Sequence, residues 1–304
     1  MEGYMEPLFE TNLTNLIHRG KVRDTYELTP SELLLVATDR VSAFDVVLPN
    51  GIPKKGQVLC RLSAFWFEKT RHLIPNHMIA LIDDISTLDH YRKQDGGIDF
   101  PEYLEGRSML VRKADRIDIE CVVRGYLSGS AWSEYRQRGT VSGEVMPDNL
   151  VESDKLAEPL FTPTTKSETG HDEPITIKQM SDMIGEELTR DIQEKTIEIY
   201  RYAEKYARSR GIIIADTKME YGFIDGKLSL IDELLTPDSS RFWDMSRYHP
   251  GGPQPSFDKQ PLRDWLSESG WNKEPPPPEL PPHVVEHTST RYCDAYLRLT
   301  GETI

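Results

Sequence analysis

The chain has 304 residues, of which 38% are hydrophobic and 28% are charged. This length allows two domains or one large one, and the composition is that of a globular protein. No stretch approaches the roughly 18 apolar residues of a membrane span, so we expect no membrane segment. The formal net charge of −14 argues against a protein that coats nucleic acid, because such proteins cluster Lys and Arg against phosphates.

The N-terminus and the cysteines indicate the compartment. The acidic start MEGYMEPLFE has neither the pattern of a secretory signal nor that of an Arg-rich transit peptide. The three cysteines, Cys60, Cys121 and Cys293, are far apart and odd in number, so they predict neither a metal site nor a disulfide framework. We therefore expect a reduced, cytoplasmic protein.

The charge is uneven along the chain. Residues 1–126 carry 16 basic and 19 acidic side chains, whereas residues 127–304 carry 20 and 31. The basic residues of the first part could form a local anion site inside an acidic protein, although solvated surface charge explains most of them equally well.

The first 125 residues are predicted to form mainly antiparallel sheet. Their apolar and alternating runs predict strands at 21–28, 32–38, 78–82, 108–112 and 117–123. One helix, over residues 59–73, interrupts them because Leu59, Leu62 and Leu73 recur near helical spacing. Several strands with one helix among them favour an α+β fold.

The middle of the chain begins with a region of weak periodicity. Residues 140–175 are rich in Pro, Thr, Ser, Gly and Asp, which predicts a long loop, and such loops are usually functional or disordered. Thr176 and Gln179 then match a capping box. It opens a helical tract that runs to Arg210 with a break near Gly185.

The last third is predicted to contain a hairpin and two helices. Strands at 212–215 and 228–231 flank a tight turn at Asp225-Gly226. Helices are expected at 261–269 and 289–300, joined by a proline-rich extended connector.

The first motif with chemical meaning is Gly20-Lys21-Val22-Arg23-Asp24, at the start of a strand. The glycine lets backbone approach a ligand, and Lys21 and Arg23 alternate onto one face of the strand. This arrangement could hold a polyphosphate, although it lacks the spacing of a Walker A loop. The alternative is a plain exposed turn.

The second motif is a strand with alternating charges followed by an acidic pair. Asp216, Lys218 and Glu220 share one face of the strand, and Asp232 lies on its hairpin partner. We expect Glu220 and Asp232 to lie across the hairpin from each other. Paired carboxylates beside a phosphate are the usual way to hold Mg²⁺, and a solvated edge is the alternative.

The third motif is an apolar strand that ends at Arg124 and continues into a Gly- and Ser-rich turn over residues 125–130. An arginine with serine hydroxyls and loop N–H groups makes a cradle for a monophosphate. A strand-to-helix turn with a surface arginine is the competing interpretation.

Two further segments could face a cleft. Residues 38–45, TDRVSAFD, follow a buried strand with polar groups. Lys166 and His171 lie in the long loop, which could close over a phosphate as a lid, although a lone histidine is more often a surface residue.

These segments together resemble one family, the phosphoribosylaminoimidazole-succinocarboxamide synthases, or SAICAR synthetases. The resemblance lies in seven stretches that occur in the family's order and span residues 20–266. They are GKVRDTYEL, ATDRVSAFDVVLPNGIPKKG, IECVVRGYLSGSAWSEY, EPLFTPTTKSETGHDEPIT, IADTKMEYGF, LIDELLTPDSSRFWD and SFDKQPLRDWL. The length resembles the single-function fungal type more than the shorter bacterial form. Two departures, Tyr221 for Phe and Ser239-Ser240 for Gly-Ser, replace no charged role.

The resemblance implies an α+β fold with ATP in a cleft. A kinase-like N-terminal lobe of antiparallel sheet, residues 1–118, would bind the nucleotide. A larger α/β lobe, residues 119–304, would bind substrate and metal and end in the C-terminal helices. The join around Arg112 to Glu120 would border the adenine.

The implied reaction joins L-aspartate to the carboxylate of an aminoimidazole ribotide. ATP would phosphorylate the carboxylate, and the amine of aspartate would displace phosphate to form the amide. Phosphorylation is needed because a free carboxylate lacks a good leaving group. The resemblance implies ATP and Mg²⁺ as cofactors and small-molecule substrates alone, and we expect a monomer.

Site roles follow residue by residue from the resemblance. ATP would contact Gly20, Lys21, Val22, Arg23, Lys113, Glu120 and Lys166. The ribotide 5′-phosphate would contact Arg124, Ser130 and Arg241. The L-aspartate side would be formed by Asp39, Arg40, Ser42 and Asp45. Mg²⁺ would be held by Glu220 and Asp232. The catalytic residues would be Lys218, Asp216 and Lys21.

Two other functions fit parts of this pattern. A small-molecule kinase would share the nucleotide site but form a phosphate ester. A binding protein without activity would be free to lose Lys21, Glu220 and Asp232, and all three are present.

Overall fold

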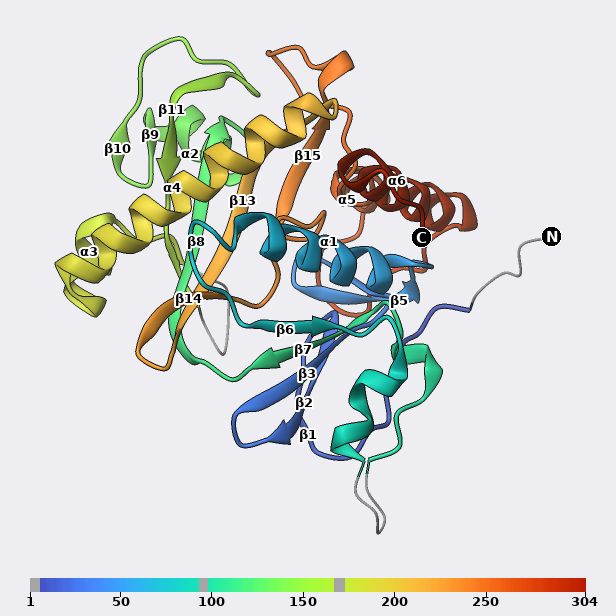
Figure 1. The fold of residues 1–304 in the computed structure, drawn as a ribbon. Helices are drawn as coiled ribbons and strands as arrows, with labels where there is room; N and C mark the ends of the chain where they lie inside the picture. Colours follow the sequence, from blue (N-terminus) through green and yellow to red (C-terminus); the bar gives the residue numbers. More distant parts are fainter. Residues whose placement is uncertain (1–5, 93–97, 167–172) are drawn as a thin grey trace.

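Two antiparallel sheets carry the fold (Figure 1). The structure is a computed structural model, and it describes residues 6–92, 98–166 and 173–304. The N-terminal sheet has five strands in the order β1-β2-β3-β7-β6. Their bounds are β1 (Leu16–Arg19), β2 (Arg23–Thr29), β3 (Glu32–Ala37), β6 (Met78–Leu81) and β7 (Ser108–Arg112).

The N-terminal sheet is covered on both faces, which explains the apolar sequence of β3. On one face of the sheet, Leu34 and Val36 pack with Leu88 and Leu104, which lie in the segment between β6 and β7. Ala37 packs on the other side in the cluster that contains the helix α1. The covering elements and the neighbouring hairpin are α1 (Lys55–Thr70), η1 (Ile85–Tyr91), η2 (Glu102–Leu104), β4 (Arg40–Ala43) and β5 (Val46–Gly51).

The second sheet has six strands around the long neighbours β8 and β13. Its main path is β11-β8-β13-β14, with β12 added to β8 and β15 added to β13. The bounds are β8 (Asp115–Tyr126), β11 (Lys155–Phe161), β12 (Thr164–Thr165), β13 (Ile212–Ile224), β14 (Lys227–Ile231) and β15 (Ser240–Asp244). A small separate hairpin consists of β9 (Thr140–Val141) and β10 (Glu144–Val145).

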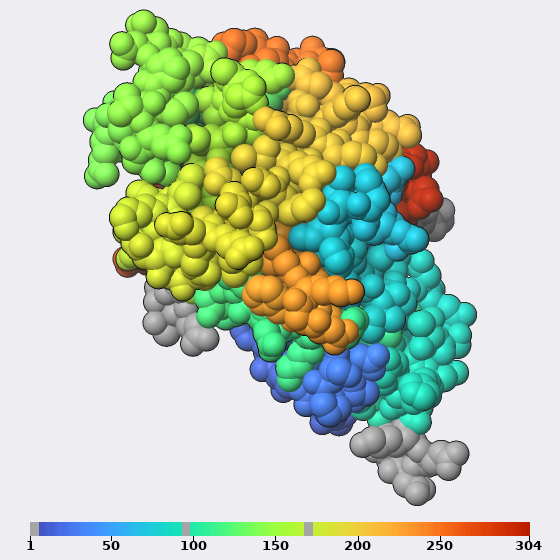
Figure 2. Space-filling view, turned by 60° about the vertical axis from the view of Figure 1, so that its left-hand side comes forward, coloured from blue at the N-terminus to red at the C-terminus, as the bar shows by residue number. Residues whose placement is uncertain are grey.

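Among the helices of the second half, α4 covers one face of this sheet. Figure 2 shows the tract of α3 and α4 in yellow, between the green 140–160 segment and the blue and teal N-terminal part. The helix α6 packs against α1. The bounds are α2 (Gly129–Arg138), α3 (Ile177–Ile184), α4 (Glu186–Ser209), η3 (Met245–Arg247), α5 (Gln260–Glu268) and α6 (Pro282–Thr300).

One hydrophobic cluster joins the two sheets. It contains Val58 and Leu62 of α1, Met109 of β7, Val123 of β8 and Met219 of β13. The boundary expected at 118/119 falls inside β8, which runs without a break from Asp115. The two sheets therefore share a core that α1 fills.

The structure confirms the helix cap, the helix break and the tight turn that short sequence motifs predicted. Thr176 and Gln179 form the capping box of α3, and Gly185, with φ of 91°, separates α3 from α4. Asp225 and Gly226 both have positive φ, as the tight turn between β13 and β14 requires. The helix bounds were less well predicted, because α1 begins at Lys55 and α6 at Pro282.

The prediction of a loop over residues 140–175 was wrong. The segment contains β9, β10, β11 and β12, and β11 and β12 pair with β8. Pro159 lies inside β11, which is tolerated because β11 is an edge strand. Over the residues described, no helix is long and apolar enough to cross a membrane.

Candidate active site

The face of β8 and β13 away from α4 carries the charged residues. Met219 and Tyr221 point to the core under α4, where the Tyr221 hydroxyl lies 2.9 Å from the Thr196 hydroxyl. Because side chains alternate along a strand, Asp216, Lys218 and Glu220 share the opposite face. The shared face that the sequence predicted is therefore present.

At one end of this face, two carboxylates oppose each other and share two lysines. Glu220 pairs in register with Glu120 across the β8–β13 ladder. Lys218 donates to Glu120 and lies 3.6 Å from Glu220, and Lys166 pairs with Glu220. Like charges on opposed positions repel, so the two ammonium groups are what allows both carboxylates to stay here. The acidic neighbours in turn raise the pKa of Lys218 although burial lowers it.

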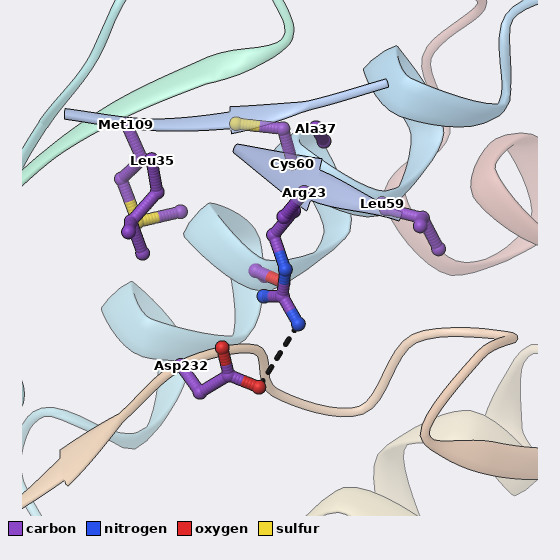
Figure 3. Close-up of a pocket in the computed structure, with 8 residues that line it drawn as sticks. Arg23, Leu35, Ala37, Leu59, Cys60, Met109 and Asp232 are labelled. Carbon is purple, nitrogen blue, oxygen red and sulfur yellow. Dashed lines mark hydrogen bonds and ion pairs between the residues drawn. The ribbon is translucent and has the colours of Figure 1, made fainter. Parts of the chain in front are cut away.

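Asp232 reaches the same end from the residue after β14. Glu220 is opposite Ile231 in the hairpin, so Asp232 follows directly and lies outside the ladder with φ of 66°. Arg23 crosses from β2 of the N-terminal sheet, and its Nη2 lies 2.9 Å from Asp232 Oδ2 (Figure 3). The same nitrogen lies 3.3 Å from Glu233 Oε1. Burial would raise the pKa of Asp232, but Arg23, Lys166 and Lys218 outweigh it and lower that pKa to about 2. Asp232 is therefore ionised at neutral pH.

Two buried residues beside Asp232 were not identified from the sequence. His77 precedes β6, and burial lowers the pKa of its imidazole to about 4 although Asp232 acts in the opposite direction. Cys60 of α1 lines a small cavity together with Arg23 and Asp232 (Figure 3). Burial raises the pKa of Cys60 to about 12, so this thiol is not a nucleophile. Neither residue has a sequence signal, because each resembles an ordinary core position.

At the other end of the face, one carboxylate holds two arginines. Asp216 Oδ2 lies 2.6 Å from Arg241 and 3.3 Å from Arg124. Arg124 also donates to Ser130 at 3.2 Å and to Thr162 at 3.0 Å. Burial lowers the pKa of Arg124, whereas Asp216 raises the pKa of Arg241. The three residues assigned to the ribotide phosphate are thus close together.

A hollow of about 530 Å³ opens beside Arg124 and Ser130. It is further lined by Arg138 of α2 and by Thr162. The turn into α2 needs glycine at Gly129, where φ is 59° and a Cβ would lie 2.2 Å from a nitrogen of Arg241. The Gly-Ser turn predicted from sequence therefore packs against the second arginine of the site.

The charged groups of residues 38–45 are mostly used within the protein. Asp39 is buried and accepts from the N–H groups of Leu8 and Gly56 and from Arg107. Arg40 pairs with Asp24 at 2.6 Å and donates to the Gly20 carbonyl at 2.9 Å.

Ser42 is half-buried on β4, and Asp45 in the turn after it pairs with Lys21. The charged side chains of the predicted aspartate segment are therefore each paired with an opposite charge elsewhere in the protein.

The remaining ATP candidates lie around β2. Lys21 is half-exposed before the strand begins, and the Val22 carbonyl accepts from the Thr38 N–H at 2.9 Å. Lys113 pairs with Glu27 near the other end of β2, at 2.8 Å. The structure thus places Lys113 away from Lys21. His171 lies outside the described residues.

A buried cluster at the start of α5 was missed although its motif was recognised. Asp238 accepts from Lys55 at 2.8 Å and from the Tyr292 hydroxyl at 2.6 Å. Lys259 lies 3.6 Å from the same carboxylate. Lys259 belongs to the stretch SFDKQPLRDWL, whose residues received no role from the sequence.

The donor set of the site suits a hard cation that also binds phosphate. Within residues 6–92, 98–166 and 173–304, no three His, Cys, Asp or Glu side chains are grouped for a metal. Glu220 and Asp232 supply carboxylate oxygens at the site's acidic end, with Glu120 and Glu233 beside them. Mg²⁺ takes one or two carboxylates and completes its shell with phosphate oxygens and water, so these residues fit it.

Known proteins resemble the chain over nearly its whole length. The family model described as SAICAR synthetase matches residues 16–278. A phosphoribosylaminoimidazole-succinocarboxamide synthase from Thermodesulfovibrio yellowstonii is 50% identical over 97% of this chain and 99% of its own. The structure of SAICAR synthase from Saccharomyces cerevisiae, complexed with SAICAR, is 42% identical and covers 98% of this chain and 99% of its own, with a TM-score of 0.87.

A more distant structure shares the fold. A SAICAR synthetase in complex with ADP is 23% identical, covers 94% of this chain and 98% of its own, and has a TM-score of 0.68. Similarity at 50% identity over the full length extends to the activity as well as the fold. The chain is a ligase of de novo purine biosynthesis with SAICAR synthase activity, and it belongs to the SAICAR synthetase family.

Proposed function

We propose that the chain forms SAICAR through an acyl phosphate, on the charged face of β8 and β13. The observation that carries this proposal is the placement of a carboxylate-rich end and an arginine-rich end on one face, separated by Lys218. The first end suits a metal-bound polyphosphate, and the second suits a monophosphate. A reaction that joins ATP to a phosphorylated ribotide needs both.

ATP is proposed to lie between the N-terminal sheet and the second sheet. The distant relative in complex with ADP supports the use of a nucleotide. Gly20, Lys21 and Val22 directly precede β2 on the N-terminal side, while Glu120 and Lys166 lie on the other side. Arg23 is proposed to act on the nucleotide indirectly, because its guanidinium already holds Asp232. Lys113, next to the join, stays a prediction for the adenine end.

The acidic end is proposed to hold Mg²⁺ through Glu220 and Asp232. Bound there, the ion would neutralise phosphate charge and polarise the transferred phosphoryl group. Arg23 holds Asp232 from the opposite sheet, and Lys166 and Lys218 hold Glu220. These cations keep the carboxylates ionised and placed.

The ribotide is proposed to bind with its 5′-phosphate at Arg124, Ser130 and Arg241. Asp216 orients both guanidinium groups, and the hollow beside Arg124 gives room for a ligand. Arginine suits this role because its planar fork can make two parallel hydrogen bonds to a phosphate.

The chemistry has two balanced steps. A carboxylate oxygen of the ribotide bonds to the γ-phosphorus of ATP, and the bond from that phosphorus to the bridging oxygen breaks, releasing ADP. The amine of L-aspartate then bonds to the carbonyl carbon, and the proton that it loses passes to solvent water. The C–O bond to phosphate breaks, and its electron pair leaves with phosphate. Lys218 and Lys21 are proposed to stabilise the negative charge that gathers on oxygen in both steps.

L-Aspartate is proposed to enter beside β4 and β5. Among the four residues predicted for it, Ser42 and Asp45 are better placed for direct contact than Asp39 and Arg40. The reason is that Asp39 and Arg40 are buried and already bonded within the protein. Those two are proposed to hold the segment in shape.

Four broader properties are part of the proposal. The N-terminal sheet and its covering segments act as the nucleotide-binding lobe, and the rest acts as the substrate and metal lobe. The chain has the longer form, which is supported by the yeast structure because the match covers 98% of this chain and 99% of that one. The fungal type itself stays a prediction, because the relative from Thermodesulfovibrio yellowstonii is bacterial. The protein works as a cytoplasmic monomer.

The test is substrate dependence of ADP release. Purified protein with ATP and Mg²⁺ should release ADP in step with amide formation only when both the carboxylated ribotide and L-aspartate are present. Sustained ADP release with a phosphate ester of a small molecule as product would instead identify a kinase. Absence of turnover with every combination would identify a binding protein.

A further inference from the structure

One glutamate of α2 holds the tip of the small hairpin formed by β9 and β10. Glu134 accepts from the Thr140 hydroxyl at 2.9 Å. It also accepts from the backbone N–H groups of Ser142 at 3.0 Å and Gly143 at 3.4 Å. Both turn residues have positive φ, 50° for Ser142 and 80° for Gly143. The carboxylate therefore stabilises a turn conformation that is uncommon for serine.

The hairpin has little stability of its own. Its strands have two residues each, and among the residues described they pair only with each other. Such an isolated two-stranded ribbon is marginal in water. Val141 is buried in a cluster with Ala131 of α2, whereas Val145 on the other strand is 86% exposed. The hairpin is thus held to α2 by one apolar contact and by the carboxylate of Glu134.

The same hairpin forms a wall of the hollow proposed for the ribotide. Val141, Ser142 and Gly143 line this hollow. Ser130 and Glu134 line it from α2, and their spacing of four residues places both on one helix face. One helix therefore carries the serine proposed for the ribotide phosphate and the carboxylate that anchors the hairpin wall.

A carboxylate that lines a hollow for a phosphate calls for a physical reason. Burial lowers the pKa of Arg124, and Glu134 is one of the carboxylates that act in the opposite direction, so its charge lies near the proposed phosphate site. Direct contact with an anionic ligand would be repulsive. The backbone N–H groups of the turn stabilise the charge instead. Holding the hairpin is therefore the role that suits Glu134.

We propose that Glu134 is a positioning residue for the ribotide, because it holds the β9–β10 hairpin in place as a wall of the hollow. This inference rests on the proposed function, since it concerns the binding of one substrate of that reaction. Without the carboxylate, the N–H groups of Ser142 and Gly143 would bond to water, and the wall would lose its fixed position. A bound ribotide would then lose contacts along that wall.

The first measurement compares Michaelis constants in Glu134→Ala, Glu134→Gln and the control Glu144→Gln. Glu144 is exposed on the same hairpin, and its side chain makes no hydrogen bond or ion pair within the described structure. A misplaced wall should raise KM for the ribotide about 10-fold in Glu134→Ala. The rise should be about fivefold in Glu134→Gln, whose amide oxygen can still accept one hydrogen bond. KM for ATP and for L-aspartate should change less than about threefold, and the control should match wild type.

Amide hydrogen exchange gives a second measurement that does not depend on activity. Loss of the carboxylate should speed exchange at Ser142 and Gly143 by about 10-fold in Glu134→Ala, because their N–H groups lose their acceptor. Addition of the ribotide alone should slow exchange over residues 139–146 in wild type and much less in this variant. A role in overall stability alone would speed exchange throughout the chain and leave KM for the ribotide unchanged.

The outcomes separate the inference from the proposed function. Wild type that makes no SAICAR, or a normal KM for the ribotide in Arg124→Ala, would overturn the proposed function or its ribotide site. If both hold, KM for the ribotide within about threefold of normal in Glu134→Ala would overturn the inference alone. Unchanged exchange at Ser142 and Gly143, or an equal rise in KM for all three substrates, would also overturn it. If Glu134→Ala fails to fold, Glu134→Gln decides by the same criteria.

Discussion

The two ends of the charged face of β13 differ in their balance of charge. Around Glu220, the ion pairs of the described residues join four carboxylates to three cations. Around Asp216, only four residues earlier, one carboxylate joins two arginines. One end therefore has surplus negative charge and suits a cation. The other has surplus positive charge and suits an anion.

This difference explains how an acidic chain can bind three anionic substrates. The net charge of −14 says little about any single place on the protein. Burial of Glu220, Asp216 and Arg124 lowers the screening by water, so local pairs dominate the field in the site. We propose that the phosphate groups of ATP and of the ribotide are selected by the charge surplus at the end where each binds.

The largest loss of activity is expected when a carboxylate is removed from the end of the face that has surplus negative charge. Glu220→Gln and Asp232→Asn should each reduce turnover by about two orders of magnitude or more, because Mg²⁺ needs negative charge as well as shape. Activity over a Mg²⁺ titration, with thermal melting beside it, checks this. Near-normal turnover in a folded variant would remove that residue from the metal site.

Removing the guanidinium of Arg124 at the arginine-rich end should give the next largest loss of activity. Arg124→Ala should lower ribotide kcat/KM by roughly 30- to 1,000-fold, since it loses a desolvated contact worth about 2–4 kcal/mol. Apparent affinities for ATP and L-aspartate should stay nearly unchanged. Arg124→Lys should remain impaired, because it keeps the charge but not the planar fork.

A ribotide analogue without the phosphate sharpens this test. Wild type should discriminate strongly against the analogue, and Arg124→Ala should lose most of that discrimination. Arg201→Ala, an exposed arginine on α4, is the matched control. Preservation of the wild-type discrimination in Arg124→Ala would assign the phosphate to Arg241 instead.

The buried cluster of Asp238, Lys55 and Lys259 allows a test of whether two buried ammonium groups are tolerated after their carboxylate is removed. Asp238→Asn should destabilise the fold by about 3 kcal/mol near neutral pH, because it leaves Lys55 and Lys259 unpaired. Burial would raise the pKa of Asp238, but Lys259 and Lys55 outweigh it and hold that pKa below its usual value of 3.8.

The lowered pKa gives this prediction a pH dependence. A depressed folded pKa stabilises the protein fully above the unfolded pKa of about 3.9, and the stabilisation is lost as pH falls toward the folded value. The stability gap between wild type and Asp238→Asn should therefore be constant above about pH 5 and shrink below about pH 4. Denaturant unfolding across this range measures the gap, with the exposed Asp264→Asn as control. A gap that widens in acid would contradict the assigned charge.

The smallest effect is expected at the half-exposed lysine of the nucleotide side. Lys21→Ala should raise KM for ATP about 10-fold, since one partly solvated charge contact is lost. KM for the ribotide should change much less, because its phosphate is proposed to bind at the far end of the face. Equal losses for both substrates would mean that the two ends do not bind separate ligands.

The sequence predicted elements whose signals are local and missed those that depend on distant partners. Gly185 and the Asp225-Gly226 turn impose their own backbone geometry, so they were found. The strand β11 was missed because its pairing with β8 lies far away in the chain and Pro159 disguises it. Such pairings are set by tertiary context more than by propensity.

The features of the candidate site likewise divide into those with a local signal in the sequence and those that depend on distant contacts. The alternation of Asp216, Lys218 and Glu220 is a property of one strand and could be predicted. The contact of Arg23 with Asp232 joins residues 209 positions apart, and nothing local indicates it. Lys259 was noticed as part of a motif, but its ion pair with Asp238 joins it to another part of the chain and became visible only in the structure.

The alternation of side chains between the two faces of β13 limits how the length of this strand can vary. Odd positions on this stretch, Met219 and Tyr221, fill the core under α4, while Glu220 and Lys218 lie on the opposite, charged face. Inserting or deleting one residue in β13 would send the charged set into the hydrocarbon interior and the apolar set into the active site. Length changes among relatives are therefore expected in the connections between strands, and β13 should keep its length even where its apolar residues are exchanged.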